Sequence, residues 1–391
     1  MSAARPAPPG FPQHLIREDL RDFAGYSSAR TSGPTGLVDA SPRVWLNANE
    51  SGDPSAVDAE GRCRRYPEPQ PPDLVEAFAD LWATSPDRVV VGRGSDEAIE
   101  LLVRALCRPG EARDGIIVTS PTFGMYAVSA RLHGVPVVDV PQLDEDIRWR
   151  VDTAAVAEAV GRGGARLVFL ASPGNPTGTV VPLREVADLA AAVAEQAVVV
   201  VDEAYGEYTA QRSAVTLLEE HPNLVVLRTL SKAHALAGAR VGIALAHPDL
   251  AAVLRRVQAP YPVPIPVAEL ALAALSPEAL AQTRSRVGQT LVRRDQVGRW
   301  LRDLPGVRAV YAGEANFLLV RAEDPDRLLS ALDGAGVVVR DLRQQPLLQD
   351  AVRITIGTGT EMEQVRQALA GLRPDPTSTN PPRPTTQEPT R

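Results

Sequence analysis

Residues 198–205 read VVVVDEAY, four valines that lead into an acidic residue. The strand that we expect here, 197–202, is apolar without a break, as in a strand buried on both faces of a sheet. Similar runs of Val, Ile and Leu occur at 115–119, 135–140, 166–171, 224–228 and 241–246. Helical patterns lie between several of these runs or just before them, at 96–107, 124–133, 154–160 and 183–195. This alternation predicts an α/β fold with a mainly parallel sheet that helices cover.

The C-terminal part of the chain follows a different pattern, in which a long helical stretch from 277 to about 304 precedes shorter units. Those units are expected strands at 316–320, 337–340 and 353–356 and expected helices at 325–333 and 361–372. We therefore expect a large domain at 63–276 and a smaller α/β domain at 277–373, which the segment 13–62 joins. The two ends, 1–12 and 374–391, hold four and six prolines and bury too little apolar surface, so they are expected to be disordered tails.

The composition argues against several classes of protein. The 391 residues include 41 Lys and Arg and 48 Asp and Glu, a net charge of −7, which argues against nucleic acid or an anionic membrane as the main partner. The two cysteines, Cys63 and Cys107, exclude a disulfide scaffold and a Cys-rich metal site, and the five histidines are scattered. No apolar run approaches about 18 residues, and the N-terminus lacks the apolar core of a signal peptide. A soluble cytoplasmic enzyme without a metal site is expected.

Polar residues stand at the carboxyl ends of three predicted strands: Asn175 after one, Asp202 at the end of another, and Ser231 with Lys232 after a third. Ligands of open parallel sheets bind outside these ends, so the three groups are expected to meet in one cleft. Taken alone, Asp202 could cap a turn, and a lone lysine is seldom catalytic. A lysine amine with the ordinary pKa of about 10.4 must lose its proton before it can attack an aldehyde.

A candidate anion site lies in GRGSDEAIELL at 92–102, where Gly94, Ser95 and Asp96 precede an amphipathic helix. The free N–H groups and the dipole of a helix N-terminus attract anions. Ser95 can cap the helix and bind an anion at the same time. The dinucleotide motif GxGxxG is incomplete because no third glycine follows, and the chain has no P-loop, HExxH or CxxC. The pattern therefore favours a phosphate group over a dinucleotide.

Two further strings complete a family pattern: RTLSKAHALAGAR at 228–240 and SPGNPTG at 172–178. Together with the strings above, they resemble the class I/II aminotransferases, which are pyridoxal-phosphate enzymes of fold type I. A second set resembles the histidinol-phosphate aminotransferase family and extends the likeness from about Tyr26 to Leu372. The set is YSSAR (26–30), WLNANE (45–50), RYPEPQP (65–71), SPTFGMYAVSA (120–130), APYPVPIPVA (259–268), EANFLLVR (314–321) and RITIGT (353–358). The resemblance implies a fold-type I enzyme that forms a homodimer.

The resemblance also implies a role for each candidate residue toward pyridoxal 5′-phosphate. Lys232 would hold the cofactor as a Schiff base and move the proton between Cα and C4′. Asp202 would keep the pyridine nitrogen protonated, which makes the ring an electron sink. Tyr205 and Asn175 would hydrogen-bond the ring hydroxyl. The other implied contacts are Phe123 stacked on the ring, Ser95, Asp96, Ser231 and Arg240 around the phosphate, and Tyr66 reaching across a dimer interface to the partner's phosphate.

Three positions depart from the family pattern. Phe123 stands where the family usually has tyrosine, and stacking needs only the aromatic face. Gly174 stands where the family often has asparagine, but the Asn-Pro pair that follows is intact. His234, two residues after Lys232, stands where the family often has an aromatic residue, and we interpret it as a packing residue.

On the substrate side, the resemblance implies Tyr26, Arg340, Arg353 and again Asn175. Two guanidinium groups suit a phosphate dianion and also a carboxylate. The implied reaction converts L-histidinol phosphate and 2-oxoglutarate to 3-(imidazol-4-yl)-2-oxopropyl phosphate and L-glutamate, in histidine biosynthesis. Three alternatives stay open: an aromatic aminotransferase, a decarboxylase of phosphorylated amino acids, and a non-enzymatic sensory domain that binds the cofactor. The last would need a basic DNA-binding module, of which the sequence shows none.

Overall fold

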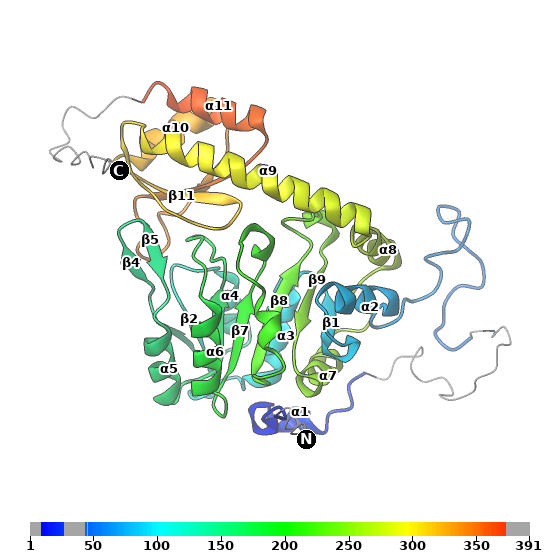
Figure 1. Cartoon of the computed structure of the whole chain (residues 1–391). Coiled ribbons are helices and arrows are strands. Elements are labelled where there is room, and N and C mark those ends of the chain that lie inside the picture. Colours follow the sequence, from blue (N-terminus) through cyan, green and yellow to red (C-terminus); the bar gives the residue numbers. More distant parts are fainter. Residues whose placement is uncertain (1–8, 27–43, 45, 373–391) are drawn as a thin grey trace, which may run out of the picture.

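The six apolar runs and one strand that was not predicted pair into a seven-stranded sheet in the computed structural model, which describes residues 9–26, 44 and 46–372 (Figure 1). In spatial order the strands are β1 (Val89–Gly92), β9 (Gly242–Leu245), β8 (Leu224–Thr229), β7 (Val198–Asp202), β6 (Ala165–Ala171), β2 (Gly115–Val118) and β3 (Val137–Asp139). The pairs from β8 to β3 are parallel, whereas β9 pairs antiparallel with both β8 and β1. The predicted α/β class with a mainly parallel sheet is therefore confirmed.

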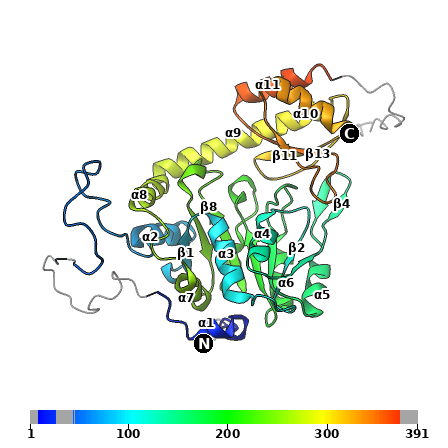
Figure 2. The same cartoon turned by 180° about the vertical axis from the view of Figure 1, so that it is seen from behind.

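The valine run of β7 shows why this sheet needs helices on both faces. Val199 and Val201 point into one apolar core, while Val198 and Val200 point into the other. The first core is closed by α2 (Pro72–Leu81), α5 (Thr153–Gly161), α6 (Leu183–Ala192) and α8 (Ile265–Ala274). The second is closed by α3 (Ser95–Leu106), α4 (Met125–Leu132) and α7 (Pro248–Val257), which face the viewer in Figure 2. Successive strand residues alternate between the faces, so an unbroken apolar run is buried throughout.

The N-terminal segment packs differently from the prediction. Phe11, Leu15 and Ile16 are 4%, 1% and 2% exposed and belong to the core under α3 and α7. The backbone N–H of Arg17 donates to the carbonyl of Ala105 at 3.0 Å, just before the short helix α1 (Glu18–Arg21). The expected tail 1–12 is thus wrong for Phe11, and the start of the segment 13–62 covers the large domain rather than the small one. Three apolar side chains within six residues supply the buried area that holds it there.

The small domain is built on a four-stranded antiparallel sheet. Its order is β10 (Val307–Val310), β11 (Phe317–Ala322), β13 (Ala351–Thr355) and β12 (Arg340–Asp341). Helices α10 (Pro325–Gly334) and α11 (Gly359–Leu369) and the C-terminal half of α9 (Pro277–Arg302) close its core. The expected strand 337–340 is wrong except for its last residue, because only Arg340 and Asp341 pair with β13. The large domain reaches this unit through the hairpin β4 (Leu143–Glu145) and β5 (Arg148–Arg150).

Helix α9 bridges the two domains. Its 26 residues span about 39 Å and run across the top of the large sheet to the small domain (Figure 1). The proposed boundary at residue 277 coincides with the start of this helix. The predicted tails at 1–8 and 374–391, and residues 27–30 of the YSSAR string, lie outside the described residues. No helix in the described part of the chain is long and apolar enough to cross a membrane.

Candidate active site

The carboxyl ends of β6, β7 and β8 open into a cavity of about 520 Å³ between the two domains. Both domains line it, the small one through Arg340, Leu342, Gln345 and Arg353. All predicted site residues except Tyr26 and Tyr66 lie on its wall. These are Ser95, Asp96, Phe123, Asn175, Asp202, Tyr205, Ser231, Lys232, Arg240, Arg340 and Arg353. The structure thus brings together residues that are up to 258 positions apart in the sequence (Ser95 to Arg353: 353 − 95).

Lys232 is the only lysine of the chain, in which the other 40 basic residues are arginines. It follows β8, and its Nζ lies 5.6 Å from the centre of the Tyr205 ring. Burial lowers the pKa of Lys232, and the positive charge of Arg353 lowers it further. Both effects favour the neutral amine, which is the form that can attack an aldehyde. The cavity therefore contains one group suited to bind a carbonyl carbon covalently.

Asp202 ends β7 and is 5% exposed. Its Oδ1 accepts a hydrogen bond from the backbone N–H of Ala204 at 3.0 Å, and its Oδ2 accepts one from the hydroxyl of Tyr126 at 2.8 Å. Burial raises the pKa of Asp202, while these two donors oppose the rise. No cation pairs with this carboxylate among the residues the structure describes. A buried carboxylate on a cavity wall is suited to hold a cationic ring nitrogen.

An anion cup lies at the N-terminus of α3. Arg240 has a left-handed backbone with φ of 55°, and its guanidinium donates to the Ser231 hydroxyl at 3.3 Å and pairs with Asp96 at 2.9 Å. Asp96 therefore orients Arg240, and the direct anion donors would be Arg240, Ser231 and the helix N–H groups at Ser95. A Cβ on Gly242 would lie 2.4 Å from the Ser95 nitrogen. Only glycine permits this close approach of β9 to the cup.

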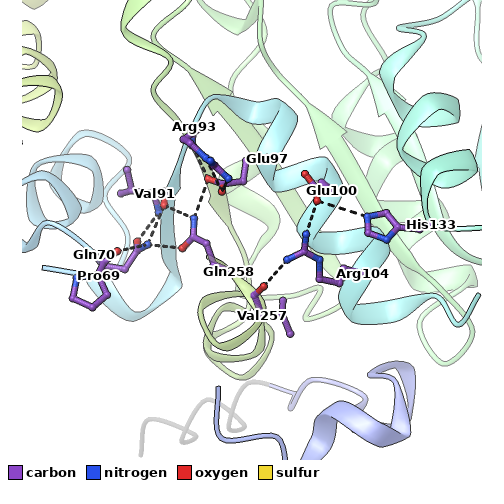
Figure 3. A network of polar contacts seen from close by, with 10 residues as sticks. All are labelled: Pro69, Gln70, Val91, Arg93, Glu97, Glu100, Arg104, His133, Val257 and Gln258. Carbon is purple, nitrogen blue, oxygen red and sulfur yellow. Dashed lines mark hydrogen bonds and ion pairs between the residues drawn. The ribbon is translucent and has the colours of Figure 1, made fainter. Parts of the chain in front are cut away.

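A polar network on the far side of the same turn fixes the start of α3 (Figure 3). Glu97 is 6% exposed and accepts from the Arg93 backbone N–H at 2.7 Å, from the Arg93 guanidinium at 2.8 Å and from Gln258 at 3.1 Å. Gln258 in turn accepts from Gln70 at 2.8 Å, and the Gln70 carbonyl accepts from the Val91 N–H at 2.8 Å. The network ties β1, α3 and the end of α7 together. It therefore holds the cup rigid from outside the cavity.

Arg340 and Arg353 form the opposite wall of the cavity, directly opposite each other on β12 and β13. Like charges in this register repel, and Arg340 contributes to a lowered pKa of Arg353, for which burial is the larger cause. Neither guanidinium pairs with a carboxylate in the described chain. Arg353 instead donates to the Asn175 side-chain carbonyl and lies 5.1 Å from the Phe317 ring centre. Two facing cations without an acidic partner form a site for an anionic group.

The aromatic residues of the wall pack closely around this site. Tyr205 is 8% exposed and meets Phe317 edge-to-face at 5.3 Å, and burial raises the pKa of Tyr205 to about 12. Its hydroxyl is therefore protonated at neutral pH and can donate a hydrogen bond. Phe123 lines the cavity and meets Tyr126 edge-to-face at 5.6 Å.

Two predicted site residues lie elsewhere. Tyr66 is 51% exposed and stacks on Tyr261 with ring centres 4.8 Å apart. Tyr26 is 68% exposed and borders a separate hollow of about 570 Å³ that includes Arg255 and Pro260. The fold does not bring either side chain to the cavity of its own chain.

Several residues of the cavity wall were missed by the sequence analysis, among them the polar side chains of Tyr126 and Gln345. Tyr126 lies in the quoted string SPTFGMYAVSA, but its place on an apolar helix face makes it look like a core residue. Gln345 follows the short strand β12, where the pattern carries no signal. His234 is 8% exposed and its Nε2 lies 3.8 Å from Glu207, outside the cavity, so its geometry supports the packing interpretation. No group of three potential metal ligands occurs among the described residues.

The chemistry of the wall fits one cofactor. A primary amine, a buried carboxylate and an anion cup match the aldehyde, the ring nitrogen and the phosphate of pyridoxal 5′-phosphate. The close approach of Gly242 to the backbone of Gly94 and Ser95 holds the turn of the cup against β9, which a side chain at position 242 would prevent.

Comparisons with known proteins agree with this arrangement. The sequence matches the model of the family aminotransferase class I and II over residues 31–372. A histidinol-phosphate aminotransferase of Stenotrophomonas maltophilia is 53% identical over 359 residues, 92% of this chain and 96% of that protein. One of Xylella fastidiosa is 50% identical over 92% of this chain and 95% of that protein. The solved histidinol-phosphate aminotransferase of Sinorhizobium meliloti, in complex with pyridoxal-5′-phosphate, has a TM-score of 0.70 and 29% identity over 82% of this chain and 88% of that one. The chain therefore belongs to the class I and II aminotransferase family and, within it, to the histidinol-phosphate aminotransferases.

Proposed function

We propose that this chain binds pyridoxal 5′-phosphate and transfers the amino group of L-histidinol phosphate to 2-oxoglutarate, as a step of histidine biosynthesis. The products are 3-(imidazol-4-yl)-2-oxopropyl phosphate and L-glutamate. The observation that carries the proposal is the combination, in one cavity, of the sole lysine with the facing pair Arg340 and Arg353. The first is suited to an aldehyde and the second to the anionic end of a substrate.

The residues of the cavity wall would each have a separate role in the reaction. When bound, the cofactor supplies an aldehyde that takes up an amino group and a ring that accepts an electron pair from Cα. Lys232 would bond the aldehyde and, once displaced by the substrate amine, move the proton at the substrate Cα. Transfer by a positioned base is worth roughly 10²–10⁴-fold in rate. Asp202 would hold the ring nitrogen protonated, and Asn175 and Tyr205 would hold the ring hydroxyl.

The arginine pair explains how one site accepts two unlike substrates. Histidinol phosphate offers a phosphate dianion, and glutamate offers carboxylates instead. A guanidinium fork binds both groups through two parallel hydrogen bonds. The bond from Arg353 to Asn175 supports this role, because it links the anion site to the wall that would hold the cofactor.

Covalent trapping tests the cofactor assignment without a turnover assay. Pyridoxal phosphate is added to the apoprotein, the mixture is reduced with borohydride, and the adduct is mapped by mass spectrometry. Because Lys232 is the only lysine, the α-amino group is the only competing primary amine. We expect one adduct, at Lys232, and none at that peptide in Lys232→Ala. A wild-type chain that gains no adduct at Lys232 would contradict the assignment.

A panel of kcat/KM values tests the substrate. Histidinol phosphate, phenylalanine, tyrosine and glutamate are compared on the wild type, on Arg340→Ala and on Arg343→Ala. Arg343 is a matched control because it pairs with Asp341 at 2.9 Å and Asp326 at 2.7 Å and does not line the cavity. A charge-assisted contact is worth about 1.5–3 kcal/mol, so Arg340→Ala should lower kcat/KM for histidinol phosphate by about ten- to a hundredfold. The control should change it less than about threefold. If phenylalanine is the better substrate of the wild type, the substrate assignment fails.

We also propose that the enzyme acts in the cytoplasm as a homodimer in which Tyr66 serves the partner's cofactor phosphate. The exposed stack of Tyr66 on Tyr261 supports this, as does the apolar helix α8, where Leu270 and Leu272 are 48% and 37% exposed. Exposed apolar side chains on one helix are typical of a subunit interface.

Subunit hybrids test this arrangement. Lys232→Ala and Tyr66→Ala are each expected to be weakly active or inactive alone. In a hybrid dimer, one site combines an intact Lys232 from one chain with an intact Tyr66 from the other. Random reassortment should therefore restore about a quarter of the wild-type activity. If mixing restores nothing although native mass spectrometry shows hybrids, Tyr66 serves its own chain. An active species that sediments as a monomer would refute the dimer.

A further inference from the structure

The side chain of Tyr126 is held on all sides at the wall of the cavity. It is 0% exposed, its ring stacks on Phe169 with centres 4.6 Å apart and planes 7° apart, and Phe123 meets it edge-to-face at 5.6 Å. Its hydroxyl donates to Oδ2 of Asp202 at 2.8 Å. Burial raises the pKa of Tyr126, with Asp202 as a further cause, so this hydroxyl keeps its proton. The hydroxyl therefore remains a hydrogen-bond donor, and the packing of the ring keeps it directed at Asp202.

Asp202 depends on this donor. Its other hydrogen bond comes from the backbone N–H of Ala204. Asp202 forms no ion pair in the part of the chain that the structure describes, and the positive charge of Arg228 is a weaker influence on its pKa than the two hydrogen bonds. Burial favours the protonated carboxyl, and the Tyr126 hydrogen bond is the largest effect that opposes it. A protonated Asp202 could not stabilise a cationic ring nitrogen by charge.

We propose that Tyr126 is a positioning residue that keeps Asp202 ionised and in place, and so strengthens the hold of the apoprotein on the protonated ring nitrogen of its cofactor. This inference rests on the proposed function, in which Asp202 meets that nitrogen. It assigns a chemical task to a residue of α4 whose hydroxyl meets Asp202. The hydroxyl acts through Asp202 alone, while the Tyr126 ring serves packing.

A cofactor analogue separates the effect of the Tyr126 hydroxyl on cofactor binding from the effect of the Tyr126 ring. In 1-deazapyridoxal 5′-phosphate the ring nitrogen is replaced by C–H, so Asp202 has no cation to hold. The equilibrium dissociation constants of both compounds are measured for apo wild type and apo Tyr126→Phe by dialysis. A hydrogen bond to a charged group predicts about tenfold weaker binding of pyridoxal phosphate by the variant. Binding of the deaza analogue should change less than about twofold.

Tyr311→Phe is the matched control. Tyr311 is 2% exposed and also donates its hydroxyl to a carboxylate, Asp144 at 2.8 Å, but it lies in the small domain outside the cavity. It should leave both dissociation constants unchanged. The double variant Tyr126→Phe/Asp202→Asn should bind pyridoxal phosphate as Asp202→Asn does, since the hydroxyl then has no carboxylate to serve.

The outcomes separate this inference from the proposed function. Equal weakening of both compounds by Tyr126→Phe would show a packing role, and no weakening of either would show no role; both overturn the inference. A further loss in the double variant would do the same. A wild type that traps pyridoxal phosphate at Lys232 but fails to use histidinol phosphate would overturn the substrate assignment and leave the Tyr126 comparison intact.

Discussion

Two clusters of charged residues lie side by side at the carboxyl ends of β7 and β8, and they differ in how their charges are partnered. The closed cluster comprises Glu203, Glu207, Arg228 and His234. Arg228 pairs with Glu203 at 2.7 Å and with Glu207, and its guanidinium lies 4.0 Å from the centre of the Trp82 ring. Arg228 and Glu203 are 4% and 5% exposed. Here each charge has a partner from the same chain.

The open cluster, by contrast, comprises Lys232, Arg340, Arg353 and Asp202 on the cavity wall. Its cations have no acidic partner and its carboxylate has no cationic one among the described residues. Lys232 and Arg340 are exposed to the cavity, whereas Arg353 is half-buried and Asp202 is buried. An unpaired charge away from water costs free energy, so a fold that leaves Asp202 and Arg353 without ion-pair partners has a gain elsewhere. Asp202 and Glu203 are consecutive, yet they fall in different clusters. The comparison teaches that the missing partner, more than the residue type, marks the binding site.

The largest effect that tests the comparison is the loss of Lys232. Lys232→Ala should lower turnover by about 10⁴-fold or more, because it removes both the covalent anchor and the proton-transfer base. The melting temperature of the apoprotein should stay within about 2 °C of wild type, since no internal partner loses its charge. Both are measured on the same preparation. Turnover close to that of the wild type would refute the role of Lys232.

In the closed cluster, a substitution is expected to lower stability and leave turnover nearly unchanged. Arg228→Met should lower the free energy of unfolding by about 3–5 kcal/mol, because Glu203 and Glu207 would remain buried without a cation. Denaturant titration measures this change, and kcat per folded molecule should stay within about threefold. Arg184→Met is the control, since the Arg184 side chain is 92% exposed and its ion pair with Asp188 is long, at 3.7 Å. It should change stability by less than about 0.5 kcal/mol. If Arg228→Met lost activity while its stability stayed unchanged, the assignment of the closed cluster to stability and not to catalysis would be wrong.

The pH dependence of cofactor capture probes the open cluster more finely. Burial is the main cause of the lowered pKa of Lys232, and Arg353 is the second. Arg353→Gln should therefore raise the pKa of Lys232. A protonated amine does not attack an aldehyde, so the midpoint of the pH profile for covalent capture by the apoprotein should move to higher pH. The capture rate is followed by absorbance. Arg343→Gln should leave the profile in place, and a shift to lower pH in Arg353→Gln would contradict the cause assigned here.

The sequence alone predicts the open cluster better than the closed one. Lys232, Asp202 and Asn175 follow apolar strands, and parallel strands bring their carboxyl ends to one edge, so the cleft can be inferred without a structure. The pairing of Arg228 with Glu203 depends on two side chains 25 positions apart turning toward each other, which no local pattern encodes. Tyr126 illustrates the same limit, because a buried tyrosine on a helix has the pattern of a core residue whatever its hydroxyl meets.

The secondary structure likewise contains elements that the sequence predicts and elements that it does not. The six apolar runs of the large sheet were predicted to within a few residues, but β1, with three consecutive valines, was not predicted. Strand β12 was predicted as four residues and has two, since sheet pairing and not composition ends it. Helices α1, α2, α7 and α8 were not predicted. Helix α8 is apolar nearly all around, which removes the periodic signal of a surface helix. The N-terminal residues Phe11 to Ile16 pack on elements distant in sequence, and such contacts leave no local trace.

The smallest expected effect is on kcat/KM when Phe123 is replaced by tyrosine, which adds one hydroxyl group. Phe169→Tyr is the comparison, because both phenylalanines pack on Tyr126. Phe123 lines the cavity, and Phe169 is 0% exposed with its ring stacked on Tyr126. Phe123→Tyr should change kcat/KM by less than about threefold and leave stability unchanged, because a ring stacks through its face and an added hydroxyl can extend into the cavity. Phe169→Tyr should instead cost about 1–3 kcal/mol of unfolding free energy, because its hydroxyl would enter a filled core. Steady-state kinetics and denaturant titration on both variants decide this. Equal tolerance at both positions would mean that the wall of the cavity is no more open than the core behind it, and the distinction between the open and closed regions would lose its structural basis.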